Sequence, residues 1–314
     1  MFSLKKRYAA SRVFFIIGLC LVVFITFQGI ALAAAPKQKT FPSPEAALEN
    51  LIQAVRDHNE KELLALFGPD NEWLVTSGDP VSDQQNREKF IRFYDEKHSL
   101  EKINEKKFLL HMGNNDWVFA VPVVQKGSIW IWDTKQGKEE ILNRRIGENE
   151  LDTIQTCLAI VDAQQDYAAV DRDGDGLREY AQKFHSTKGK KDGLFWEAAP
   201  GEGESPLGPL LAKARSEGYE KGDEPVPYNG YYFRILTSQG KSANGSAYSY
   251  MVNGKLLGGF AVVAYPATYG VTGVKTFIVN HQGVVYQKDL GLNTVKLAAA
   301  MKTFNPDKTW KKAQ

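Results

Sequence analysis

The stretch that decides the fold of the C-terminal half runs from Glu148 to Phe184 and reads ENELDTIQTCLAIVDAQQDYAAVDRDGDGLREYAQKF. Its apolar residues recur at three- and four-residue steps, at Leu151, Ile154, Leu158 and Val161. This spacing is typical of one face of an amphipathic helix. The stretch therefore predicts a long helix, a tight acidic turn, and a second short helix over Leu177 to Phe184.

The acidic turn is the best candidate for chemistry in the sequence. Asp-x-Asp-x-Asp-Gly places carboxylates at alternate positions and ends on a glycine that permits a sharp turn, as hard cations such as Ca²⁺ require. The EF-hand position for a bidentate glutamate is Gln182 here, so Glu179 is the expected substitute. The predicted ligands of a structural calcium ion are Asp171, Asp173, Asp175, the carbonyl of Leu177, and Glu179. The alternative is an acidic connector whose side-chain oxygens cap the segment that follows.

The first 33 residues have the layout of a signal peptide. A basic start (Lys5, Lys6, Arg7, Arg12) precedes an apolar run over Val13 to Ile30 and a small-x-small site at Ala31 to Ala33. Cleavage would remove four positive charges and change the formal net charge from +2 to −2, which argues against nucleic acid as a general partner. We expect an exported protein, periplasmic or associated with the cell envelope. Membrane contact is expected only through this segment, if it is retained as an anchor.

Residues 39–147 are expected to form an α+β domain. Helices are predicted from Pro44 (after an N-capping Ser43), over Glu60 to Phe67, over Ser82 to Lys97 and over Glu139 to Ile146. Strands are predicted over Phe108 to Met112, Trp117 to Gln125 and Ser128 to Asp133. Pro122 indicates an edge strand or a bulge. This order of elements resembles nuclear transport factor-type domains, in which a curved sheet encloses a pocket; Trp117, Trp130 and Trp132 then either line that pocket or, as we favour, pack in the core.

Residues 148–314 are expected to form a second α+β domain, a long helix packed on an antiparallel sheet. Five strands are predicted, over Tyr231 to Thr237, Ala247 to Val252, Gly259 to Tyr265, Lys275 to Val279 and Val284 to Lys288. Short helices are expected over Leu210 to Glu217 and Thr294 to Phe304. After cleavage of the leader the only cysteine would be Cys157, expected to be a small buried hydrophobe.

Two resemblances follow from these segments. The Glu148 helix with the strands near Tyr231, Phe260, Lys275 and Val284 resembles the globular part of type IV pilin-like and pseudopilin-like proteins, although their N-terminal cleavage motif is lacking. Nearly the whole chain after the leader resembles the bacterial domain of unknown function 2950 family, through Ser77 to Pro80, Glu140 to Gly147, Asp171 to Phe184, Ser205 to Leu210 and Gly258 to Gly291. The resemblance implies an exported bacterial protein whose activity is not established, and it transfers no catalytic residues.

No nucleophile elbow, zinc-protease motif or nucleotide-binding glycine pattern occurs in the chain. We therefore expect a non-catalytic envelope module that binds an unknown envelope protein or polymer, rather than an enzyme. The alternative is an envelope-acting hydrolase with a carboxylate-lined cleft between the domains, using Asp79, Glu140 or Glu150. A third hypothesis is a subunit of an envelope assembly.

Overall fold

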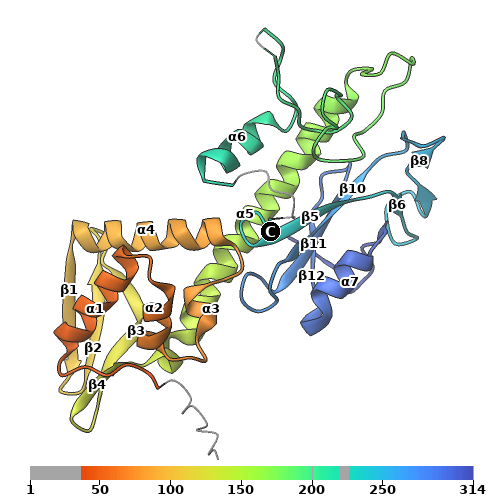
Figure 1. The fold of residues 1–314 in the computed structure, drawn as a ribbon. Helices are drawn as coiled ribbons and strands as arrows, with labels where there is room; N and C mark the ends of the chain where they lie inside the picture. Colours follow the sequence, from red (N-terminus) through yellow and green to blue (C-terminus); the bar gives the residue numbers. More distant parts are fainter. Residues whose placement is uncertain (1–36, 200, 220–225, 314) are drawn as a thin grey trace, which may run out of the picture. The chain divides into compact units, whose positions relative to one another are not determined.

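Four helices and a four-stranded antiparallel sheet form the N-terminal part of the described chain (Figure 1). The structure is a computed structural model and describes residues 37–199, 201–219 and 226–313, so the predicted signal peptide lies outside the described residues. The helices are α1 (Pro44–Arg56), α2 (Glu60–Phe67), α3 (Glu72–Val75) and α4 (Pro80–Glu96). The strands are β1 (His98–Asn104), β2 (Lys107–Met112), β3 (Trp117–Lys126) and β4 (Ile129–Trp132), in the order β1-β2-β3-β4.

The helix starts follow from local sequence. The Ser43 hydroxyl accepts a hydrogen bond from the backbone N–H of Ala46 (3.2 Å), and a proline occupies the first turn of α1. Asp79 caps α4 in the same way, accepting from the N–H of Ser82 at 3.1 Å. Each cap satisfies a backbone donor that has no partner within the helix.

Pro122, for which the sequence predicts an edge strand or a bulge, lies in strand β3. The strand lies between β2 and β4, so it is not an edge strand. Its register against β2 shifts, because Phe108 faces Val123 whereas Leu110 faces Phe119. The extra residues form a bulge that contains Pro122, where the missing N–H breaks no regular pair.

The core under this sheet is built from aromatic side chains. Phe67, Phe119 and Trp132 form a mutual cluster with ring centroids 5.8–6.3 Å apart. Trp132 is fully buried and Trp130 is 8% exposed, so both pack in the core as favoured from the sequence. Trp117 is only half-buried.

A single helix, α5 (Thr134–Ala168), replaces the two helices predicted on either side of Gly147. At 1.5 Å per residue its 35 residues extend about 50 Å. A glycine inside a helix costs only about 1 kcal/mol, which the flanking turns offset, so Gly147 does not end it. The predicted domain boundary falls inside this helix, and residues 36–314 form one compact unit; the division into two domains stays a prediction.

The C-terminal sheet has the order β14-β12-β11-β10-β5. Its strands are β5 (Tyr231–Leu236), β10 (Ala261–Pro266), β11 (Lys275–Asn280), β12 (Tyr286–Asp289) and β14 (Lys311–Lys312). Residues 261–264 of β10 are all fully buried, as expected for a strand covered on both faces, and both α5 and α7 (Thr294–Ala300) contact it. The remaining elements are α6 (Gly208–Ser216), η1 (Gly291–Asn293), β6 (Ser238–Gln239), β7 (Tyr248–Ser249), β8 (Met251–Val252), β9 (Lys255–Leu256) and β13 (Thr303–Phe304).

The α+β class is therefore confirmed, whereas the likenesses to nuclear transport factor-type domains and to pilins stay predictions. The helix predicted over Leu177 to Phe184 is wrong. The backbone groups of that segment bond to distant partners, since the N–H of Tyr180 donates to Leu256 O (2.9 Å) and Ala181 exchanges two bonds with the Gln164 side chain. Helix α7 ends at Ala300, earlier than predicted, because Thr303–Phe304 pairs with β6. Asn293 makes no side-chain cap.

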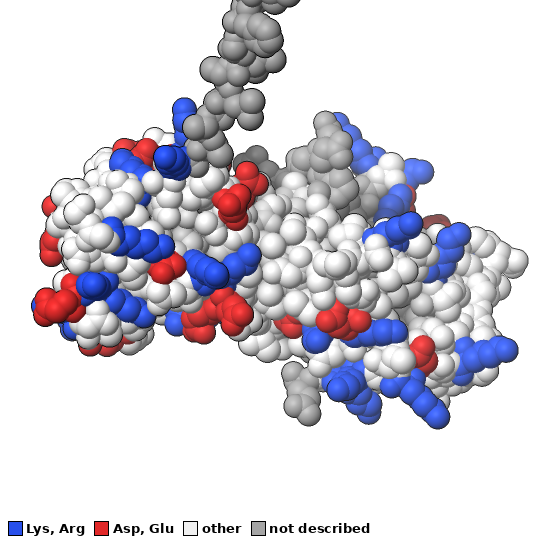
Figure 2. All heavy atoms as spheres, turned by 90° about the horizontal axis from the view of Figure 1, so that it is seen from below, with Lys and Arg blue, Asp and Glu red and all other residues white. Residues whose placement is uncertain are grey.

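Charge is unevenly distributed along the described chain. Residues 37–219 hold 24 lysines and arginines against 32 acids (net −8), whereas residues 226–313 hold ten against two (net +8). Figure 2 shows blue and red side chains intermixed over the N-terminal part of one face, with blue predominating over the C-terminal part. No helix among the described residues has the length and apolar character needed to cross a membrane.

Candidate functional site

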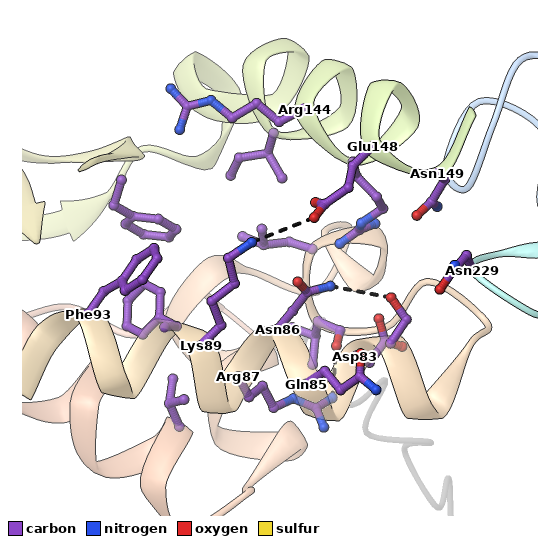
Figure 3. A pocket seen from close by; sticks show the side chains of 18 of the residues that line it. Asp83, Gln85, Asn86, Arg87, Lys89, Phe93, Arg144, Glu148, Asn149 and Asn229 are labelled. Carbon is purple, nitrogen blue, oxygen red and sulfur yellow. Dashed lines mark hydrogen bonds and ion pairs between the residues drawn. The ribbon is translucent and has the colours of Figure 1, made fainter. Parts of the chain in front are cut away.

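A cavity of about 440 Å³ opens between helices α4 and α5 (Figure 3). Its floor is apolar and comes from α1–α5 and β3: Leu51, Val55, Leu63, Phe67, Leu74, Val75, Phe90, Phe93, Trp117, Phe119 and Ile141. Its mouth is polar and includes Ser82, Asp83, Gln85, Asn86, Arg87, Lys89, Arg144, Arg145, Glu148, Asn149, Asp152, Lys213, Glu217 and Asn229. An apolar cavity of this volume with a few convergent polar groups is typical of small-ligand sites.

The cavity floor is an edge-to-face aromatic array. The Phe90 ring lies 5.4 Å from the Phe119 ring at 81° and 6.4 Å from the Trp117 ring at 86°. The Arg144 guanidinium lies 5.4 Å from the Trp117 ring centre, and its Nη1 donates to Val118 O at 2.9 Å. These contacts fix the orientation of the half-buried tryptophan, which supplies an apolar surface beside a cation.

The mouth of the cavity carries both positively and negatively charged side chains. Lys89 on α4 reaches across to Glu148 on α5, with Nζ and Oε1 3.6 Å apart (Figure 3). Both side chains are largely exposed, so this pair contributes little to stability and is free to exchange partners. Deeper in, Arg145 donates to Trp73 O at 2.7 Å, and burial lowers its pKa.

Residues far along the chain complete the mouth. Lys213, Glu217 and Asn229 line it, and the Gln85 amide donates to Glu217 O at 2.5 Å. Asp152 of α5 is partly buried there. Burial raises its pKa, and the neighbouring Glu148 raises it further.

Asp79 holds these segments together. Its carboxylate is fully buried, and Oδ2 accepts from the Tyr219 hydroxyl (2.8 Å) and from the N–H of Gly230 (2.9 Å). Burial raises the pKa of this carboxyl. Gly230 has φ +73°, and a Cβ there would meet Asn149 Nδ2 at 2.7 Å, so the backbone can approach only as glycine.

None of the three carboxylates proposed from the sequence for hydrolysis lines the cavity. Asp79 is engaged as above, and Glu150 accepts from the N–H groups of Val274 and Lys275 at 2.9 and 2.8 Å. Glu140 pairs with Arg144 one helical turn away. The acids that do line the cavity are Asp83, Glu148, Asp152 and Glu217, which sequence reasoning missed because they are scattered over 135 residues without a motif.

The acidic turn has the predicted crowding of carboxylates. Asp171, Asp173 and Asp175 each place an oxygen within 4.8 Å of the others, so the group could hold a metal ion. Asp171 also organises the turn, because its two oxygens accept from the N–H groups of Gly174 and Gly176 at 2.8 Å. The hydrogen bond from Gly176 lowers the pKa of Asp171.

A lysine far from the turn in sequence, which no motif points to, lies among these carboxylates. Lys255 Nζ is 2.6 Å from an oxygen of Asp173 and 2.6 Å from one of Asp175, and 3.6 Å from Glu179. Its hydrogen bonds to Asp173 and then Asp175 raise the pKa of Lys255. The expected ligand Leu177 donates its N–H to Asp175. The aspartates of the turn thus accept hydrogen bonds from its own backbone N–H groups, and they also bind a cation, the Lys255 ammonium.

Cys157 is fully buried on α5, as predicted, and burial raises its pKa to about 12. A thiol in that state is neither a nucleophile nor a metal ligand at neutral pH.

The family described as protein of unknown function (DUF2950) matches residues 38–313, which is most of the chain. The protein belongs to this family. No curated protein and no solved structure matches the chain. The matched residues include those of the cavity, Asp79 with its hydrogen-bond partners, and the acidic turn. The family description gives no activity for any of these sites.

Proposed function

We propose that this protein is an exported, non-catalytic module of the cell envelope that binds a ligand in the cavity between α4 and α5. The observation that carries the proposal is the combination of an aromatic floor with a mouth that presents both charges. Ligand sites in proteins typically have volumes of about 300–1,000 Å³ and a few oriented polar groups. The ligand that fits is a segment of an envelope protein or polymer with one apolar group and nearby charged groups.

The cavity can be tested with the fluorescent probe 8-anilinonaphthalene-1-sulfonate, which has an apolar ring system and an anionic group. Asn86 is exposed at the mouth, so Asn86→Trp should obstruct the cavity without disturbing the core. We expect at least a tenfold loss of probe affinity. Gln84→Trp, exposed on the same helix but outside the lining, is the matched control. Equal affinity of the two variants would refute binding in this cavity.

We further propose that Ca²⁺ stabilises the acidic turn by displacing the Lys255 ammonium from Asp173 and Asp175. Three carboxylates, with Glu179 beside them, form the oxygen-rich environment that Ca²⁺ prefers. A saturating ion at about 100 times its dissociation constant would add about 2.7 kcal/mol to stability.

Thermal unfolding in excess chelator and in millimolar Ca²⁺ tests this. We expect an upward shift with Ca²⁺ that is absent in Asp173→Ala and larger in Lys255→Met, where no ammonium competes. If Ca²⁺ shifts the unfolding temperature of neither the wild-type protein nor Lys255→Met, the calcium proposal is wrong. The carboxylates of Asp171 and Asp175 then serve only to accept hydrogen bonds from the backbone of the turn.

An envelope-acting hydrolase is the second candidate, favoured by one observation. Burial raises the pKa of Asp152, and Glu148 and Glu217 lie close enough to influence it. A partly buried carboxyl whose pKa is raised, with further acidic side chains beside it, is a candidate general acid. Asp152→Asn should abolish turnover of solubilised envelope polymer if this is right. An unmeasurable rate for the wild-type protein would leave the binding module as the function.

A further inference from the structure

The 3-10 turn η1 and the short helix α7 that follows it expose apolar side chains that nothing in the described chain covers. Leu292 is 90% exposed, Val295 43% and Leu297 49%. Only Thr294 and Ala298 of the helix are buried, and Arg234 fixes its end by donating to Ala298 O at 2.7 Å and to Met301 O. Val295 and Leu297 are therefore exposed on a well-anchored helix, and Leu292 is exposed on η1 directly before it.

Lysines lie near these residues in the sequence and on the sheet that α7 packs against. Lys296 lies on α7 itself and Lys302 directly follows it, while Lys311 and Lys312 form β14, which pairs with β12. The Lys288 ammonium lies over the Trp310 ring at 5.8 Å. The only acids among residues 226–313, Asp289 and Asp307, accept hydrogen bonds from the Tyr269 and Thr309 hydroxyls, respectively. These apolar residues thus belong to the part of the chain, residues 226–313, that carries a net charge of +8.

We propose that this surface, Leu292, Val295 and Leu297 together with Lys296 and Lys302, docks on an anionic lipid surface. A lipid interface accepts both components at once, since aliphatic side chains enter the boundary between headgroups and acyl chains while lysines pair with anionic headgroups. A soluble polyanion such as nucleic acid would use the lysines but would gain little from three exposed aliphatic side chains. Membrane contact is then not confined to the N-terminal segment, and it does not depend on ligand binding in the cavity.

The test uses the compact unit 36–314, which contains both hydrophobic cores and lacks the apolar leader. We measure sedimentation with vesicles of phosphatidylcholine, alone or mixed with phosphatidylglycerol. Binding should require phosphatidylglycerol and weaken with added salt. Leu292→Ser/Leu297→Ser should weaken it at least tenfold, as should Lys296→Glu/Lys302→Glu, because each lysine near an anionic surface contributes about fivefold in affinity.

The matched control is Ile103→Ser/Lys106→Glu, which alters an exposed apolar residue and an exposed lysine in the acidic N-terminal part. It should bind vesicles like the wild-type protein. A duplex oligonucleotide at the same ionic strength identifies the competing explanation. If the lysine variant loses binding to vesicles and oligonucleotide alike while the leucine variant loses neither, the face is a general polyanion site and the lipid proposal is overturned. Equal binding to neutral vesicles overturns it as well.

Discussion

Replacing Asp79 by alanine should be among the most damaging single substitutions outside the apolar cores. The carboxylate is fully buried and accepts from Ser82 N–H, the Tyr219 hydroxyl and Gly230 N–H. Loss of the helix cap costs about 1 kcal/mol. Each of the other two donors, left without a partner, costs about 1–3 kcal/mol. These terms sum to about 3–7 kcal/mol, at the upper end of what single substitutions cause.

Urea unfolding followed by tryptophan fluorescence measures this loss. Asp79→Ala should lower the midpoint and leave the slope unchanged, because the surface exposed on unfolding stays the same. The control is Asp70→Ala, which removes an exposed acid near the start of α3 and should change stability by less than about 0.5 kcal/mol.

A double-mutant cycle tests the reasoning more strictly. Tyr219 and Asp79 are 140 residues apart in sequence, so their hydrogen bond joins distant segments. Tyr219→Phe alone should cost about 1–2 kcal/mol and should cost much less in the Asp79→Ala background. Strictly additive effects, or a loss below about 1 kcal/mol for Asp79→Ala, would refute the role assigned to this carboxylate.

Three further predictions follow from single side chains. Burial raises the pKa of Asp79 above its value in the unfolded chain. Its contribution to stability is therefore present at low pH and is lost as the pH rises through the folded-state pKa. Relative to Asp79→Asn, the unfolding free energy of the wild-type protein, measured with urea, should therefore fall as the pH increases from acidic to mildly alkaline. Gly137→Ala should lower the unfolding free energy by about 1–3 kcal/mol, because a Cβ would meet Ala120 O of β3 at 2.7 Å, whereas Gly147→Ala, with open space around it, should not destabilise the protein. Cys157 should react with a thiol reagent only at the rate of unfolding, since it is fully buried with a pKa of about 12; fast labelling of the folded protein would contradict this.

The sequence predicted best those elements that local signals define. Ser43 and Pro44 mark the start of α1, and α2 spans Glu60–Phe67 as expected, because caps and apolar stripes act within a few residues. Strand β1 was missed, since its residues are nearly all exposed and show no apolar alternation. The prediction of a short helix over Leu177 to Phe184 was wrong because of contacts that are distant in sequence. Backbone groups of this segment form hydrogen bonds with Leu256 and Gln164 instead of with each other.

The cavity could be anticipated only in outline. Trp117 was one of three tryptophans considered for a pocket, and it is the one that lines the cavity. The polar mouth has no sequence signature, because Asp83, Glu148 and Glu217 converge only after α4, α5 and α6 have packed. The Ser77–Pro80 stretch attracted attention as a motif of the family, and the structure gives it a physical role, since Asp79 caps α4 and binds the Tyr219 and Gly230 segments.

The acidic turn shows why ligand chemistry cannot be inferred from one segment alone. Its alternating carboxylates predict a divalent cation, and the crowding is present. The repulsion among them is nevertheless relieved by Lys255, 82 residues from Asp173 in sequence. An ammonium satisfies two carboxylates with a single charge, whereas Ca²⁺ needs six to eight oxygens. Any Ca²⁺ that binds the turn, as we propose, must therefore compete with an intramolecular cation of high effective concentration, so its apparent affinity should rise when that lysine is neutralised.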